Sequence, residues 1–160
     1  MPFLTDLELR YVGSGTYETT APLVYRGASD TITVPTRFRT DLASVPRIFW
    51  WFLPPTGLYE RAATFHDFGC VGLANGTCLL SSRDVDGLFR RQIREDGTGF
   101  VKRWVLWWGV RLGALAKPTR RPGWWKDLPL VALITVLVLG VTVVGVLAIH
   151  AGVDWVLFLL

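Results

Sequence analysis

An uninterrupted apolar run near the C-terminus constrains the fold of this chain more than any other feature. Between Leu128 and Ile149 there is no charged residue, and most positions are Leu, Val or Ile. As a helix rising ~1.5 Å per residue, the run is about 33 Å long, enough to cross a bilayer core of ~30 Å. A helix that is apolar on every side needs lipid or a very large protein core around it. We therefore predict a membrane-spanning helix over residues 128–149, the alternative being a buried helix hairpin inside a larger assembly.

The residues before this run are typical of a membrane–water interface. Between Lys117 and Asp127 the chain carries four basic residues and two adjacent tryptophans. Indole rings favour the headgroup level, and basic side chains attract anionic lipid. No comparable basic cluster follows the apolar run, so the positive-inside tendency predicts a single-pass protein with a cytoplasmic N-terminal domain. Residues 150–160 are apolar apart from Asp154, which predicts a re-entrant or interfacial tail.

These features divide the chain into four segments. We expect a small α+β domain over 1–98, a Trp-rich amphipathic helix with a basic linker over 99–127, the membrane helix over 128–149 and the apolar tail over 150–160. Two placements of the Trp-rich helix are open: it lies along the membrane plane, or it contributes to the core of the domain. The residues predicted at the membrane interface are Trp104, Trp107, Trp108, Arg120, Arg121, Trp124, Trp125 and Lys126.

Strand signals fill the first forty residues. Segments 7–12, 17–25 and 31–38 are rich in Thr, Tyr and Val or alternate in polarity, and turn residues such as Gly13-Ser14-Gly15 separate them. We predict a short antiparallel meander of three strands. With the helices that follow, it makes an α+β domain.

Helical periodicity begins after a Pro-Pro-Thr-Gly turn. A first helix is expected to start near Leu58. A second starts with a capping box formed by Ser81 and Asp84, and its arginine-rich face is expected to be a solvated surface. A third is expected over about 99–116. The predicted fold is therefore a short sheet packed with two or three helices, plus one C-terminal transmembrane helix.

The charge and the cysteine content limit the kinds of partner and metal site that we expect. The net charge is +4, and much of the excess lies beside the apolar run, which favours lipid headgroups over nucleic acid. The two cysteines, Cys70 and Cys78, form no CxxC pair, so a cysteine zinc site is disfavoured. The two cysteines either form a disulfide that closes a small loop or remain as two reduced thiols. We expect no cofactor.

One stretch concentrates chemically active side chains. Asp41 and Ser44 can accept backbone N–H groups in a turn, and Arg47 can pair with a nearby carboxylate. We favour a polar structural network that fixes the strand–helix junction. The alternative is a set of metal ligands or acid–base groups. The predicted network comprises Asp41, Ser44, Arg47, His66, Asp67 and Asp84, and the catalytic candidates among them are Asp41, Ser44, His66 and Asp67.

These residues resemble a known family. The motifs are Thr40-Asp41-Leu42-Ala43-Ser44-Val45-Pro46-Arg47, the Pro-Pro-x-Gly turn, Ala62-Ala63-x-x-His66-Asp67 and Asp84-x-x-x-x-Phe89. Together they resemble a domain-of-unknown-function family encoded by tailed phages and by prophages, over roughly 34–94. The resemblance implies a phage or prophage origin near tail genes, with no assigned activity. Its usual members are compact soluble domains, so the Trp-rich linker and the spanning helix are additions here.

Three functions fit these observations. The first is a non-enzymatic phage structural or accessory protein, a minor tail component at the tail tip whose apolar segment engages the host membrane. The second is a membrane-anchored exclusion or lysis factor made in the infected cell. The third is a metal-dependent envelope hydrolase. We expect the first, located in the virion tail or the host inner membrane, with other tail proteins and host lipid as partners. Self-association through Gly140 and Gly145 stays open.

Overall fold

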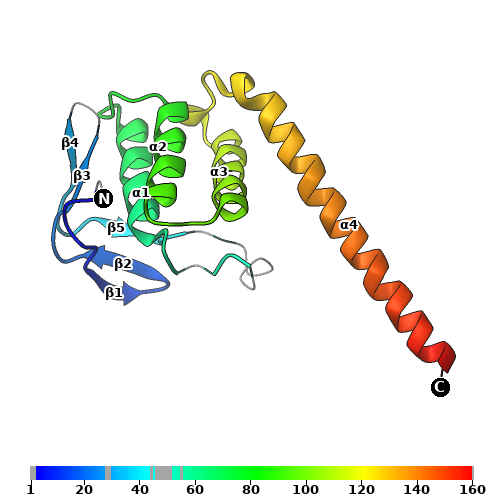
Figure 1. Ribbon diagram of the computed structural model, residues 1–160. Coiled ribbons are helices and arrows are strands. Elements are labelled where there is room, and N and C mark those ends of the chain that lie inside the picture. Colours follow the sequence, from blue (N-terminus) through cyan, green and yellow to red (C-terminus); the bar gives the residue numbers. More distant parts are fainter. Residues whose placement is uncertain (1–2, 28–29, 44, 46–51, 55, 160) are drawn as a thin grey trace. The chain divides into compact units, whose positions relative to one another are not determined.

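The computed structural model describes residues 3–27, 30–43, 45, 52–54 and 56–159. The chain separates into two compact units, residues 1–123 and 124–160. The first unit holds all the strands and three helices, and the second holds one long helix (Figure 1). Each unit is considered by itself below. The predicted α+β class is confirmed.

Among the described residues, five short strands form two small antiparallel sheets. β1 (Leu9–Gly13), β2 (Thr16–Thr19) and β5 (Arg39–Thr40) make one sheet in the order β1-β2-β5. β3 (Leu23–Arg26) and β4 (Thr31–Val34) make the other, with Leu23 opposite Val34.

Proline explains why two of the predicted strands are shorter than expected. The predicted segment 17–25 is split between β2 and β3, with Pro22 in the break, and β4 stops just before Pro35. Proline has no backbone N–H to donate to a neighbouring strand, so regular pairing ends at these two positions. The single meander predicted from the sequence is therefore two separate sheets.

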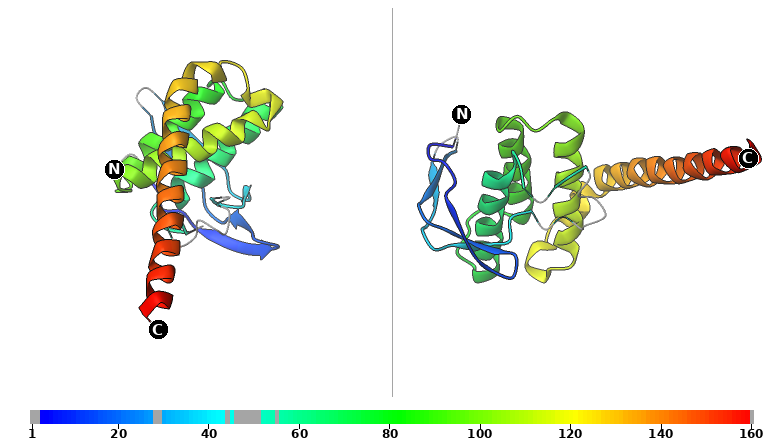
Figure 2. Two further views of the ribbon diagram at one scale, coloured as in Figure 1. Left: turned by 90° about the vertical axis from the view of Figure 1, so that its right-hand side faces the viewer. Right: turned by 90° about the horizontal axis from the view of Figure 1, so that it is seen from below.

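Three helices complete the first unit. They are α1 (Glu60–Asn75), α2 (Ser82–Glu95) and α3 (Phe100–Leu115), followed by the 3-10 turn η2 (Pro118–Arg120). The predicted capping box at the start of α2 is confirmed: the Ser81 hydroxyl accepts the Asp84 N–H, and the Asp84 carboxylate accepts the Ser81 N–H. The β3–β4 hairpin lies on one side of the α1–α2 pair and α3 lies on the other (Figure 2).

Two apolar clusters hold this unit together. One joins the β3–β4 hairpin to α1 through Phe3, Leu23, Tyr25, Val34 and Phe65. The other joins the three helices through Leu53, Tyr59, Ala62, Ala63, Phe89, Ile93 and Leu106. Trp107 is also buried, whereas Trp104 and Trp108 are half-buried. The Trp-rich helix therefore contributes to the core of the domain, as one of the two alternatives predicted.

The second unit consists of the 3-10 turn η3 (Trp124–Asp127) and α4 (Leu128–Leu159). One helix among the described residues is long and apolar enough to cross a membrane, over Trp124–Gly152. Many of its apolar side chains are exposed, among them Val136, Leu139, Val141 and Val144. The helix does not end at residue 149, because the residues that follow are again mostly apolar and no proline interrupts them. Ala151 and Gly152 are helical, and α4 continues to Leu159. The tail predicted as a separate piece is thus the last part of this helix.

A close approach between α1 and α2 gives a first prediction. A Cβ atom placed on Gly69 would lie 2.9 Å from Cγ1 of Val85, well inside van der Waals contact. Gly69→Ala is therefore expected to lower the free energy of unfolding by about 1–3 kcal/mol through overpacking. The matched control is Gly109→Ala in α3, where a Cβ meets nothing within 4 Å. Denaturant titration of both variants checks this, and equal stabilities would contradict the tight packing.

Candidate functional site

A buried aspartate at the centre of the helical layer organises the polar interior of the first unit. Asp86 lies on α2 and is fully buried, as expected for a residue one turn from Phe89 and two turns from Ile93 on the same helix face. Its Oδ1 atom lies 2.7 Å from Nε2 of His66, which α1 contributes. Because an ionised carboxylate only accepts hydrogen bonds, Nε2 is the nitrogen that carries the proton.

Two arginines complete the shell of Asp86. Nη1 of Arg111, from α3, donates to Asp86 Oδ2 at 2.7 Å, and Arg111 is fully buried. Arg120, from η2, donates to Oδ1 of the same carboxylate and also lies 3.4 Å from the Ser82 hydroxyl. One carboxylate thus joins α1, α2, α3 and η2. We call His66, Asp86, Arg111 and Arg120 the Asp86 network.

The electrostatics of the Asp86 network favour an ionised aspartate and a neutral histidine. Burial alone would raise the pKa of Asp86, but the hydrogen bond from His66 and the charge of Arg120 outweigh it and hold the pKa below its usual range. Burial lowers the pKa of His66 against the opposing effect of Asp86, and Arg120 lowers it further. The positive charges of Arg111 and Arg120 therefore compensate the negative charge of Asp86, and the neutral His66 ring donates a further hydrogen bond to it.

Cys70 lies one helical turn after His66, with its sulfur 3.8 Å from His66 Nδ1. This spacing resembles a cysteine–histidine pair. However, burial raises the pKa of Cys70 to about 11. The group is therefore a thiol at neutral pH, and the thiolate that nucleophilic chemistry requires is not formed. Cys70 and Cys78 are both free cysteines, so the reduced alternative is the one observed.

Asp67 makes a second polar contact, between α1 and β5. The Thr40 hydroxyl donates to Asp67 Oδ2 at 2.5 Å and accepts the N–H of Leu42 at 3.0 Å. Burial raises the pKa of Asp67 to about 7, because the hydrogen bond from Thr40 only partly offsets desolvation and the charge of Asp41 adds to it. Asp67 is therefore partly protonated at neutral pH.

The structure separates the residues predicted to form one network. His66 and Asp67 are buried or half-buried as neighbours on α1, but they contact different partners. Asp41 is exposed, and Asp84 belongs to the α2 capping box. Ser44 and Arg47 lie outside the described residues.

Three residues that the sequence did not assign to this site complete it. Asp86 and Arg111 were not singled out, and Arg120 was predicted at the membrane interface but is 4% exposed and contacts Asp86. A charged residue on the apolar face of an amphipathic helix was the available signal for Asp86, because Val85 and Phe89 flank it.

The geometry suits a structural clamp better than a reaction centre. Each member of the Asp86 network is at most 8% exposed, so a substrate does not reach it in this conformation. Within the described ranges, no three His, Cys, Asp or Glu side chains come together as a metal-binding group. The set Asp41, His66, Asp67 and Asp84 considered for a metal is dispersed.

Comparison with known proteins places the domain in a family. No curated protein and no solved structure matches the chain. A family model described as a protein of unknown function (DUF1353) matches residues 17–110, more than half of the 160 residues. The matched region includes most of β2, all of β3 to β5, α1 and α2, and most of α3, and therefore His66 and Asp86. Arg111 follows the matched region directly, and Arg120 lies further along the chain. The chain belongs to the DUF1353 family.

Proposed function

We propose that this chain is a bacteriophage tail component that carries a folded DUF1353 domain and a helix that enters the host membrane. The observation that carries the proposal is α4, whose stretch 128–149 has no charged residue and exposes its apolar side chains. Lipid is the environment in which such a surface is stable. The domain before it has two apolar clusters of its own.

The residues at the start of the helix support membrane engagement. Trp125 is 71% exposed, and Lys117, Arg121 and Lys126 are exposed as well. Arg120 does not contribute to this interface, because the Asp86 network holds it. An exposed indole and three cations still match the composition of a headgroup layer. By the positive-inside tendency the DUF1353 domain then lies on the cytoplasmic side.

The assignment to a phage tail rests on the family. The motifs of this chain resemble a phage- and prophage-encoded family, and the match to DUF1353 supports the part of that resemblance that concerns a domain of unknown function. A tail-tip protein that stores an apolar helix and releases it into the host membrane accounts for both parts of the chain. The second candidate function is a membrane protein of the lysogen with the same anchor. Such a protein would be found in the host membrane and not in the phage particle, which distinguishes it from a tail component.

Charge placed in the middle of α4 tests membrane engagement. Replacing both Leu139 and Val143 with Arg is expected to raise the free energy of membrane insertion by about 2.5–3.5 kcal/mol per residue. The double variant is therefore expected to lose its alkali-resistant association with the membrane. The matched control replaces the same two residues with Ala, which removes volume without adding charge. Each chain is produced in bacteria, and the membrane pellet is extracted at alkaline pH. Retention of the Arg variant in the pellet would contradict a spanning helix.

A further inference from the structure

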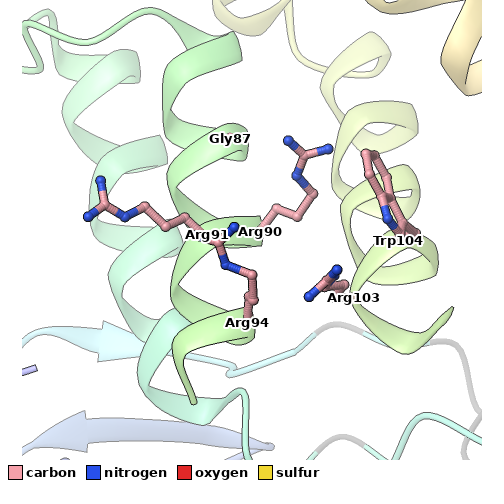
Figure 3. A pocket seen from close by; sticks show the side chains of 6 residues that line it. All are labelled: Gly87, Arg90, Arg91, Arg94, Arg103 and Trp104. Atoms are coloured by element: carbon pink, nitrogen blue, oxygen red, sulfur yellow. The ribbon is translucent and has the colours of Figure 1, made fainter. Parts of the chain in front are cut away.

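The arginine-rich face of α2 is part of a surface pocket. Gly87, Arg90, Arg91 and Arg94 recur at helical spacing, and Arg103 and Trp104 of α3 close the other side (Figure 3). The pocket has a volume of about 290 Å³. The predicted solvated surface is confirmed at Arg91 and Arg94, which are exposed, and the structure adds Arg103 of α3 beside them.

No acidic side chain lines this pocket among the described residues. Arg91 is paired on its own helix, with Nε 2.8 Å from Glu95 Oε1, and its side chain extends away from α3 (Figure 3). The other lining cations are Arg90, Arg94 and Arg103. Like charges held close together on a surface repel one another, so the arrangement favours an anion between them.

Aromatic contacts hold two of the guanidinium groups in place. Arg90 lies over the Trp104 ring, with its Cζ 4.1 Å from the ring centroid, and Arg103 lies 4.9 Å from the centroid of Phe100. Such cation–π contacts limit the rotamers of both arginines. A site whose cations are already positioned loses less entropy when it binds an anion.

The wall formed by α2 leaves open space. A Cβ added at Gly87 would meet nothing within 4 Å, so the glycine leaves that side of the pocket empty. Planar guanidinium groups match the oxygen geometry of phosphate, and the volume suits a single headgroup-sized ligand.

We propose that this pocket binds the phosphate group of a small ligand. The chemistry is shared by inorganic phosphate and by the phosphodiester of an anionic lipid such as phosphatidylglycerol. The inference stands apart from the tail assignment, because it depends only on the α2–α3 surface. A failure of either proposal leaves the other standing.

Calorimetric titration of the full chain in uncharged detergent tests the site. The first ligand is inorganic phosphate and the second is a short-chain phosphatidylglycerol, with a short-chain diacylglycerol, which lacks phosphate, as the lipid control. Saturable binding of inorganic phosphate identifies free phosphate as the ligand. Binding of phosphatidylglycerol alone identifies a lipid headgroup. No saturable binding of either ligand, or equal binding of the diacylglycerol, overturns the proposal.

Variants connect the binding to the pocket. Replacing both Arg94 and Arg103 with Gln removes two charge-assisted donors and is expected to weaken binding about 10-fold or more. The control is Arg83→Gln, which makes the same Arg-to-Gln replacement on α2 at a residue that does not line this pocket. Gly87→Leu fills the pocket without changing charge and is expected to abolish binding, while α2 stays folded because Leu has a higher helix propensity than Gly. Unchanged affinity in both pocket variants would contradict the assignment.

Discussion

Asp86→Asn is expected to lower the free energy of unfolding of the DUF1353 domain by about 3–5 kcal/mol. The variant keeps the shape of the side chain but removes the negative charge of Asp86, which pairs with Arg111 and Arg120. Both guanidinium groups are buried, so each loses a charged partner in a poorly solvated interior. The expected loss therefore exceeds that of a single neutral hydrogen bond.

A matched control lies two residues away. Asp84→Asn makes the same chemical change on the same helix, but Asp84 is exposed and only caps α2, so we expect a loss below about 1 kcal/mol. Urea titration of the full chain in uncharged detergent, followed by near-UV circular dichroism, measures both variants. Losses of equal size would show that the Asp86 network does not hold the four segments together.

Asp67→Asn is expected to stabilise the domain by roughly 2–4 kcal/mol at pH 8, since each pKa unit corresponds to ~1.4 kcal/mol. The pKa of Asp67 is raised from 3.8 to about 7 in the folded chain, mainly by burial. A folded pKa above the unfolded value means that the native state binds the extra proton. Stability is therefore lost as the pH rises from about 4 to about 7. Asparagine removes the ionisation and still accepts the hydrogen bond from Thr40.

The pH dependence identifies the group responsible. His66 acts in the opposite direction, because its lowered pKa makes the folded chain lose stability as the pH falls below 6.5. The difference between the wild type and Asp67→Asn cancels this contribution and isolates Asp67. The control is Asp6→Asn, which makes the same chemical change at a carboxylate that is 97% exposed. If the difference in unfolding free energy is the same at pH 4.5 and pH 8, Asp67 does not titrate in this range.

Local signals predicted the helices well. The apolar run gave α4, and the Ser81–Asp84 box gave the start of α2, because each depends on residues close together in the chain. The predicted bounds of the strands were less accurate near Pro22 and Pro35, since the segments that contain these prolines otherwise have strand composition. The end of α4 was instead predicted as a separate re-entrant or interfacial tail, because the run 128–149 is by itself long enough to cross a bilayer.

The candidate site was harder to predict for a physical reason. Asp86 meets His66, Arg111 and Arg120 across separations of 20, 25 and 34 residues, and no periodicity encodes such contacts. Arg120 stands in a basic, Trp-rich segment whose composition indicates a membrane interface, and only the packing of η2 reveals its burial. The motif around residues 40–47 drew attention to Asp41, which proved exposed.

The most direct test of the proposed function is quantitative mass spectrometry of purified particles of the proposed source phage. A constant small copy number per particle is the expected result for a minor tail component that carries its membrane helix to the host. Absence from the particles, with recovery of the chain in the membranes of infected cells, would contradict the tail assignment. The anchored protein of the infected cell would then be the function that fits.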